Sequence, residues 1–159
     1  MRRGAGMSAP SVELRPAVAA DLPAVRQLLV ACGLPVADLT AALLEGFVVA
    51  VRGGAVLGVA GLEPAGRDAL LRSVAVRAEQ RGTGLGTRLV DACLTGARDQ
   101  HMRALFLIPN DATAEAFFTH LGFGAIDRGQ VPAAVRALPE FGHLCPQTHP
   151  CLCLALGGD

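Results

Sequence analysis

Lysine, tyrosine and tryptophan are all missing from this sequence of 159 residues, in which each of the 14 basic residues is an arginine. Without lysine the chain forms neither a Schiff base nor the usual phosphate contact of a P-loop. Without tyrosine no phenol donates a proton to a leaving group. Several common kinds of enzyme are therefore excluded by composition alone.

An excess of charge of one sign and long apolar runs are also lacking. The 14 basic residues balance 14 acidic ones, so no global field attracts the chain to nucleic acid or to an anionic membrane. The longest apolar runs, such as residues 47–51 and 104–108, are far shorter than the roughly 20 residues of a membrane-spanning helix. We therefore expect a small-molecule partner, no nucleic acid and no membrane.

Length and composition fit one domain. The chain has the length of a single domain of about 100–200 residues, and 52% of its residues are hydrophobic. Because residues 1–6 lack the apolar segment of a signal peptide, we expect a flexible tail at residues 1–9 and one domain at residues 10–159. The five cysteines, an odd number, do not fit a secreted disulfide framework, so we expect reduced thiols and a cytoplasmic location.

Apolar periodicity predicts an alternation of strands and helices. Alternating or β-branched segments predict strands at residues 12–15, 47–51, 55–62, 69–76, 104–108, 125–127 and 151–156. Apolar positions at helical spacing predict helices at residues 21–32, 38–44, 84–100 and 113–121, and a short helix from residue 132, and Asp38 can cap the second of these. The segment Arg52-Gly53-Gly54 predicts a tight hairpin turn, so the strands it joins should begin an antiparallel meander.

The segment Arg81-Gly82-Thr83-Gly84-Leu85-Gly86 lies between a predicted strand and a predicted helix. A helix N-terminus leaves backbone N–H groups unpaired, and glycines allow a pyrophosphate to approach them closely. The segment lacks the Gly-Lys-Ser/Thr of a P-loop, and it follows hairpin strands where a dinucleotide-binding fold has a βαβ unit. A glycine-rich turn can also serve only as a connection, but the pattern favours a diphosphate cofactor other than ATP or NAD.

This loop resembles that of the GNAT acetyltransferase family, whose pattern Arg/Gln-x-x-Gly-x-Gly/Ala matches Arg81, Gly84 and Gly86. The resemblance extends over nearly the whole chain, because residues 14–17 are similar to the family's first strand and residues 114–123 to its Ala-x-x-Phe-Tyr-x-x-Leu-Gly-Phe helix. It implies an α/β fold of the GNAT type, with a single mixed, mostly antiparallel sheet of six to seven strands flanked by helices. It also implies an acetyl-CoA-dependent N-acetyltransferase that needs no metal and is a monomer or homodimer.

Carried over to this chain, the resemblance places acetyl-CoA along the loop and the strand before it. Amides of the loop would bind the pyrophosphate, and the backbone of Val74 would meet the acetyl carbonyl, where a strand N–H can stabilise an oxyanion. For Asp111, beside a predicted coenzyme contact, capping of the following helix is the alternative role. The expected cofactor-binding residues are Val74, Val76, Arg81, Gly82, Thr83, Gly84, Leu85, Gly86, Thr87 and Asn110.

The catalytic groups depart from the family pattern. The family's tyrosine acid corresponds to Phe118, which cannot donate a proton, so the acid is either another group or water. His120 lies two positions further along the helix and should point elsewhere. Glu63, at the end of its strand, is the best-placed base and Glu45 is the alternative, although Glu63 could also be a solvated strand end. The predicted catalytic residues are Glu63 and, through its backbone, Val74.

Arg72 indicates the class of acceptor. It lies within an otherwise apolar strand, so its guanidinium needs a partner. A substrate carboxylate bound in bidentate fashion would be one such partner, and an intramolecular salt bridge is the equal alternative. The predicted substrate-binding residues are Arg72, Ser73 and Glu45, for an amino-acid-like acceptor.

Within the family, the chain is most similar to the arsenic-resistance N-acetyltransferase branch, through residues 61–63, 71–76, 113–118 and 141–146. That branch also resembles N-acetylglutamate synthase-type proteins. The resemblance implies that the acceptor is a glutamate-like amino acid or its arsenical or phosphinic analogue, and that the protein acts in arsenic resistance. Acetylation would remove the ammonium charge and with it the mimicry of glutamate.

A binding or sensing protein is the second hypothesis. A protein with an acyl-CoA fold could hold a soft metal or trivalent arsenic through Cys145, Cys151 and Cys153, with His143 and His149 nearby. Two of these cysteines, 151 and 153, should share one face of a strand. The spacing matches no standard zinc site, and structural cysteines are the simpler interpretation.

Overall fold

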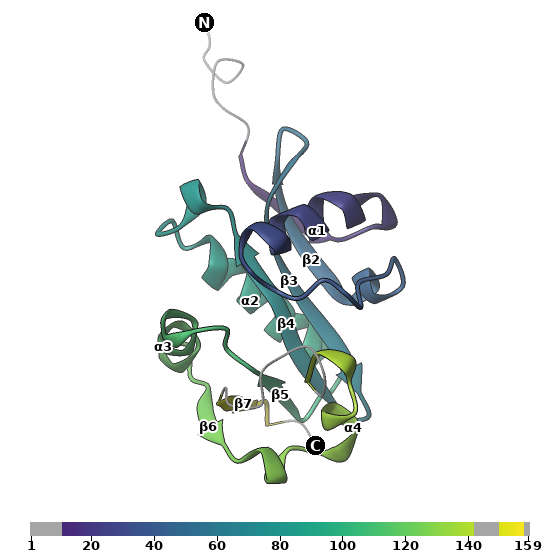
Figure 1. The fold of residues 1–159 in the computed structure, drawn as a ribbon, viewed down its shortest axis with the longest axis vertical. Helices are drawn as coiled ribbons and strands as arrows, with labels where there is room; N and C mark the ends of the chain where they lie inside the picture. The colour runs from purple at the N-terminus through teal and green to yellow at the C-terminus, as the bar shows by residue number, and fades with distance from the viewer. Residues whose placement is uncertain (1–10, 142–149, 158–159) are drawn as a thin grey trace, which may run out of the picture.

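The computed structural model describes residues 11–141 and 150–157, so the expected tail at residues 1–9 lies outside the described residues. A single seven-stranded sheet has the order β1-β2-β3-β4-β5-β7-β6 (Figure 1). Its strands are β1 (Glu13–Pro16), β2 (Phe47–Arg52), β3 (Ala55–Ala65), β4 (Asp68–Val76), β5 (Ala104–Leu107), β6 (Gly124–Ile126) and β7 (Cys151–Ala155). Among the strands of the described residues only β4 and β5 pair in parallel, which confirms the predicted mixed, mostly antiparallel sheet.

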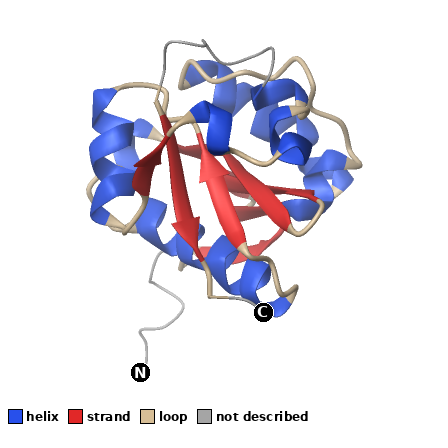
Figure 2. Cartoon of the chain, turned by 90° about the horizontal axis from the view of Figure 1, so that it is seen from below, coloured by secondary structure: helices blue, strands red, loops and turns tan. Residues whose placement is uncertain are grey.

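Helices lie on both sides of the sheet (Figure 2). The α-helices are α1 (Leu22–Ala31), α2 (Leu85–Asp99), α3 (Ala112–His120) and α4 (Ala133–Arg136). Short 3₁₀ turns are η2 (Ala19–Asp21), η3 (Leu43–Gly46), η4 (Ala78–Gln80) and η5 (Arg128–Gln130). In the part of the chain that the structure describes, no helix is long and apolar enough to span a bilayer.

Strands β2 to β4 form the predicted meander, and β1 pairs antiparallel with β2. The tight turn between β2 and β3 has Gly53 at φ 57° and Gly54 at φ 84°, positive values that glycine adopts without strain. Strand β3 is longer than predicted, because Pro64 pairs within the strand and the turn to β4 needs only two residues, one of them Gly66 at φ 67°. The interval of residues 63–68 between the two predicted strands was therefore too long.

The helix predicted at residues 38–44 is wrong. The segment instead contains only η3, whose start is held by a hydrogen bond from the backbone N–H of Leu43 to the hydroxyl of Thr40 (3.1 Å). Asp38, which was expected to cap the helix, directs its carboxylate to the guanidinium of Arg72. The side chain of Asp38 thus forms a tertiary ion pair with Arg72 and does not cap a local helix.

The two faces of the sheet carry separate cores, because successive strand residues point to opposite sides. On one side α1 packs on a cluster that contains Phe47 and Val59. On the other side α2 packs on a cluster that contains Ala60 and Leu62. Figure 1 shows the two helices on opposite sides of β3. A third cluster, around Phe106, holds α4 against the far end of the sheet.

The sheet is only weakly joined at its centre. The parallel contact between β4 and β5 consists of two residue pairs, Ala69 with Leu105 and Leu70 with Phe106. Beyond Leu70 the described pairing of these strands ends, although β4 continues to Val76. The two strands therefore separate after Leu70, and the candidate site lies in the opening between them.

Candidate active site

Strand β4 contains a β-bulge where it borders this opening. The register between β3 and β4 shifts between Val59 and Gly61, so Ser73 and Val74 both lie opposite Ala60. Ser73 has φ 57°, a left-handed conformation that costs about 1–3 kcal/mol in a residue other than glycine. A bulge leaves its extra residue out of the ladder. Backbone groups at residues 73–74 are thereby released from regular strand pairing.

Two adjoining cavities flank the bulge. The loop cavity, of about 700 Å³, extends from Val76 along the glycine loop to α3. The strand cavity, of about 400 Å³, lies between the end of β4 and the segment that follows β5. The cavities share five lining residues, which are Leu34, Val74, Asn110, Ala114 and Phe118. A long ligand in the first cavity can therefore meet a small one in the second beside Val74.

The glycine loop presents its backbone to the loop cavity. Gly82 (φ 81°) and Gly84 (φ 85°) have positive φ, and a Cβ built on either would meet no atom within 4 Å. Gly84 is the N-cap of α2, and no side chain among the described residues caps it. The first amides of α2 are therefore available to an anion, which the positive end of the helix dipole also favours.

Most predicted cofactor residues line the loop cavity. They are Val74, Val76, Arg81, Gly82, Gly84, Leu85, Gly86, Thr87 and Asn110. Thr83 does not line it, because its hydroxyl turns back and donates to the carbonyl oxygen of Gln80 (2.6 Å). Asp111 accepts a hydrogen bond from the N–H of Ala114 (2.8 Å), which confirms its role as the cap of α3.

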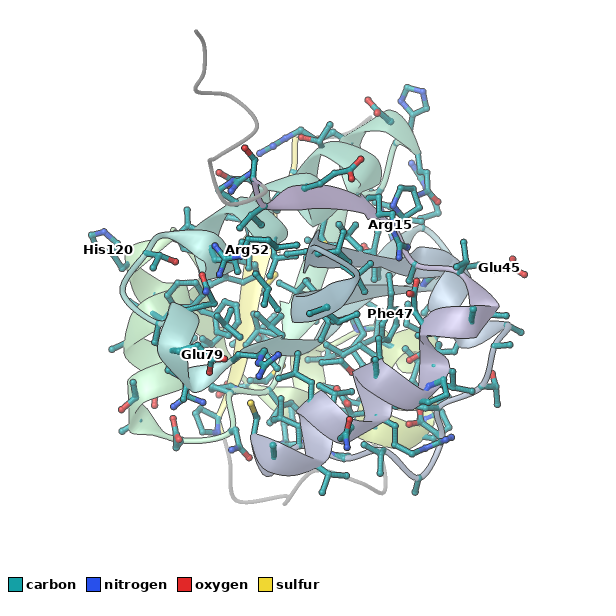
Figure 3. The ribbon with its side chains drawn as sticks, turned by 90° about the horizontal axis from the view of Figure 1, so that it is seen from above. Arg15, Glu45, Phe47, Arg52, Glu79 and His120 are labelled. Carbon is teal, nitrogen blue, oxygen red and sulfur yellow. The ribbon has the colours of Figure 1, made fainter. Side chains whose placement is uncertain are left out.

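Aromatic side chains occupy the place where the resemblance would put a proton donor. Phe118 lines both cavities and packs edge-on against Phe117, with 5.0 Å between ring centroids, and against Phe123 (5.8 Å). His120 is exposed and lines neither cavity (Figure 3). The described residues thus bring no histidine to the opening.

The guanidinium of Arg72 is fully buried and makes ion pairs with three carboxylates. Nη1 donates to Asp38 (2.6 Å) and to Glu63 (3.0 Å), while Nη2 donates to Asp38 (2.8 Å) and pairs with Glu140 (3.1 Å). Nε donates to the hydroxyl of Ser73 (3.1 Å). The sequence allowed either a substrate carboxylate or an intramolecular salt bridge as the partner of Arg72, and the structure shows the salt bridge. The Arg72 hydrogen bond also holds the pKa of Asp38 below its usual value, against the opposing effect of burial.

The two glutamates predicted as bases lie away from the cavities. Glu63 is half-buried, but its carboxylate is bound to Arg72 and it lines neither cavity. Glu45 is exposed on η3 and points outward from the molecule, whereas Phe47, two residues further along the chain, is buried (Figure 3). The prediction that Glu45 contacts the substrate therefore has no support in this geometry. An exposed 3₁₀ turn, formed in place of the predicted helix, directs it to solvent.

Sequence reasoning missed Glu140. This residue is 7% exposed, lines the strand cavity, and lies just before the segment 142–149 that is outside the described residues. Burial raises the pKa of Glu140 to about 7, with Asp38 and Glu63 adding to the shift and Arg72 opposing it. Its only sequence signal is one acidic residue within the apolar stretch from Leu138 to Phe141.

The cysteines of the second hypothesis are only partly described. Cys145, His143 and His149 lie outside the described residues. Cys151 and Cys153, both on β7, belong to the third apolar cluster, and burial raises the pKa of the Cys151 thiol to about 11. Among residues 11–141 and 150–157, no three side chains of the metal-binding types come together. The described part of this group fits a packing role.

Comparison with known proteins identifies the class of the chain. The sequence model of the Acetyltransferase (GNAT) family matches residues 26–123, which contain the glycine loop, the bulged strand and α3. The chain belongs to the GNAT acetyltransferase family. Among curated proteins, no sequence matches the chain.

Solved structures of low identity share the fold. N-acetylglutamate synthase from Neisseria gonorrhoeae, complexed with coenzyme A and N-acetyl-glutamate, superposes with a TM-score of 0.79 at 19% identity over 94% of this chain and 36% of that one. Rv2747 from Mycobacterium tuberculosis, in complex with CoA, gives 0.73 at 24% identity over 90% and 98%. A GNAT-family acetyltransferase from Staphylococcus aureus gives 0.74 at 16% over 92% and 99%. The chain spans about a third of the synthase.

Proposed function

We propose that this chain transfers the acetyl group of acetyl-CoA directly to the amine of a small molecule bound between β4 and β5. The observation that carries the proposal is the meeting of two cavities at the bulge of β4, beside Val74. The larger cavity suits the long coenzyme, and the smaller one suits its acceptor. No enzyme nucleophile is needed, because the amine attacks the thioester itself.

Coenzyme A would lie with its pyrophosphate on the amides of residues 82–87. Open space beside Gly82 and Gly84 permits this close approach. Its pantetheine arm would follow the edge of β4 past Val76 towards Val74, with Asn110 on the opposite wall. This placement uses backbone contacts, which do not depend on the identity of most side chains in the loop.

The acetyl carbonyl would lie beside Val74, where the bulge frees backbone groups from the ladder. A backbone N–H directed at the developing oxyanion contributes roughly 3–4 kcal/mol in other acyl-transfer enzymes. Phe118 cannot protonate the leaving sulfur, so the thiolate would leave as such or receive its proton from water. The low basicity of a thiolate makes this departure acceptable.

The acceptor amine would enter the strand cavity from the side of Leu34 and Pro35. Arg72, which lines this cavity, pairs with three carboxylates, so the local charge favours an ammonium group. Arg72 and Ser73 line the same cavity, as predicted substrate-side residues. However, a substrate carboxylate could reach Arg72 only by displacing one of its present partners.

The favoured acceptor is a glutamate-like amino acid or its arsenical or phosphinic analogue, with a role in arsenic resistance. Sequence similarity to the arsenic-resistance branch supports this choice. So does the shared fold with an N-acetylglutamate synthase that holds N-acetyl-glutamate. Acetylation would neutralise the α-ammonium, which an enzyme of glutamate metabolism would need for recognition.

The test is a coenzyme A release assay with several acceptors. These are glutamate, its phosphinic and arsinic analogues, other amino acids, and amines without a carboxylate. We expect the fastest release with the glutamate-like compounds. Equal release with decarboxylated amines would contradict the amino-acid specificity but keep the acetyl transfer. If no amine releases coenzyme A while the protein binds arsenite tightly, the sensing hypothesis is favoured instead.

A further inference from the structure

We propose that Glu140 is the catalytic base that removes a proton from the acceptor ammonium, the role that sequence analysis gave to Glu63. The inference rests on the proposed acetyl transfer and deepens it. Among the described residues, Glu140 is the one carboxylate that lines the strand cavity, which it shares with Val74. A base has to lie within hydrogen-bonding reach of the proton that it removes, and Glu63 lines no cavity at the bulge.

The contacts of Glu140 orient it without neutralising it. Its Oε1 pairs with Nη2 of Arg72 at 3.1 Å, which is longer than the 2.6 Å and 2.8 Å contacts of the same guanidinium with Asp38. Asp38 thus takes the bidentate position, whereas Glu140 pairs with Arg72 through one oxygen. The other oxygen, Oε2, takes no part in this ion pair and is the atom that would receive the proton.

The surrounding charges set the proton affinity of Glu140. Arg72 from β4 favours the ionised form, while burial and the carboxylates of Asp38 and Glu63 favour the protonated form, and the pKa is about 7. Such a group is ionised often enough near neutral pH to accept a proton and basic enough to hold it. Arg72 is therefore a positioning residue, which holds the base and moderates its affinity.

The proposed reaction transfers the acetyl group in one attack by the amine. The Glu140 carboxylate takes one proton from R–NH₃⁺, and the freed nitrogen lone pair forms a C–N bond to the thioester carbonyl carbon. The resulting oxyanion collapses, the C–S bond breaks, and the electron pair leaves with the coenzyme A sulfur. The nitrogen loses a second proton, which reaches the thiolate through water, and Glu140 returns its proton to solvent. The products are the N-acetyl amine, coenzyme A and one proton.

The test uses pH profiles of the full-length protein with two acceptors whose ammonium pKa values differ. For the wild type we expect kcat/KM to rise about tenfold per pH unit below pH 7 and to level off above it, with the same midpoint for both acceptors. Glu140→Gln should lower kcat by about 100-fold or more and remove this limb, while acetyl-CoA affinity measured by calorimetry stays within about twofold. Glu140→Asp should keep the limb at a lower rate. Glu13→Gln, an exposed change on β1, is the matched control.

Two outcomes would overturn the assignment of the base alone. In the first, the limb persists in Glu140→Gln. In the second, the wild-type midpoint moves with the ammonium pKa of the acceptor, since the limb would then belong to the substrate. If Glu140→Gln does not fold, the aspartate variant and the two-acceptor profile of the wild type still decide. A wild type that releases no coenzyme A with any amine would instead overturn the proposed function together with this inference.

Discussion

The proposed coenzyme end of the cleft is built from backbone, whereas the proposed acceptor end is built from buried side chains. The loop at residues 80–87 is continuous in sequence, exposed at residues 81–84, and shaped by Gly82 and Gly84. The acceptor end depends on Arg72, which collects carboxylates from three other segments of the chain. Changes in the loop should therefore affect binding and spare stability, whereas changes in the cluster should affect both.

The largest effect is expected at Arg72. Arg72→Ala would leave the carboxylates of Asp38, Glu63 and Glu140 without their common cation, and loss of one partner of a buried ion pair costs about 3–5 kcal/mol. Urea unfolding would measure the loss. The control is Arg77→Ala, which removes an ion pair whose side chains are 45% and 59% exposed and should cost about 1 kcal/mol or less. If the two variants lost equal amounts of unfolding free energy, the Arg72 cluster would be no more important for stability than an exposed ion pair.

A smaller but still large effect is expected in the loop. Gly84→Glu places a negative side chain at a positive-φ position beside the proposed pyrophosphate, so acetyl-CoA affinity should fall by about 100-fold. Calorimetry on the folded variant measures this. Gly53→Glu introduces the same side chain at φ 57° in the distant hairpin and should leave the affinity unchanged. Unaltered binding in Gly84→Glu would show that the loop is only a connection.

A more moderate, pH-dependent effect is expected for Glu140. Its pKa in the folded protein, about 7, is above its ordinary value of 4.5, so the folded state binds the extra proton between these values. The stability from this proton is fully present below pH 4.5 and is lost as pH rises through 7. Glu140→Gln imitates the protonated form, so its stability relative to wild type should increase between pH 5 and pH 8, by on the order of 2 kcal/mol. Unfolding curves at both pH values test this, and a difference that is independent of pH would contradict it.

The smallest effect is expected at Phe118. Phe118→Tyr adds one hydroxyl at a position that lines both cavities, so the variant should fold and change turnover by only about a few fold. Because the chain contains no tyrosine, the wild-type rate profile should lack a phenolic limb near pH 10. The same profile measured in the variant serves as the comparison. A limb near that pH in the wild type would mean that another acid protonates the sulfur.

The same contrast explains what the sequence could predict. The glycine loop, the hairpin at Gly53 and the helix end at Gly122 (φ 108°) are local, because each depends on backbone conformations that glycine favours within a few residues. The strands and long helices followed their hydrophobic period for the same reason. Only ends differed, as at β3, where strand pairing continued past Pro64.

The acceptor end could not be predicted in this way, because its contacts join residues that are far apart in sequence. Asp38 and Arg72 are separated by 34 positions, and nothing near either one indicates the other. Asp38 was interpreted as a helix cap because a local role was available for it. Glu140 carried no motif at all, and its importance comes from burial beside charges that only the fold brings together.

The position of β7 has a consequence for the order in which the protein can assemble. β7 lies between β5 and β6, and the described pairing gives β6 no other neighbour. On a ribosome, the meander, the glycine loop and α2 emerge early and can pack while later residues are still being translated. β6 can pair with its neighbouring strand only after residues 151–155, which form β7, have emerged. During translation the proposed coenzyme-binding loop could therefore fold before β6 and β7 complete the sheet on the proposed acceptor side.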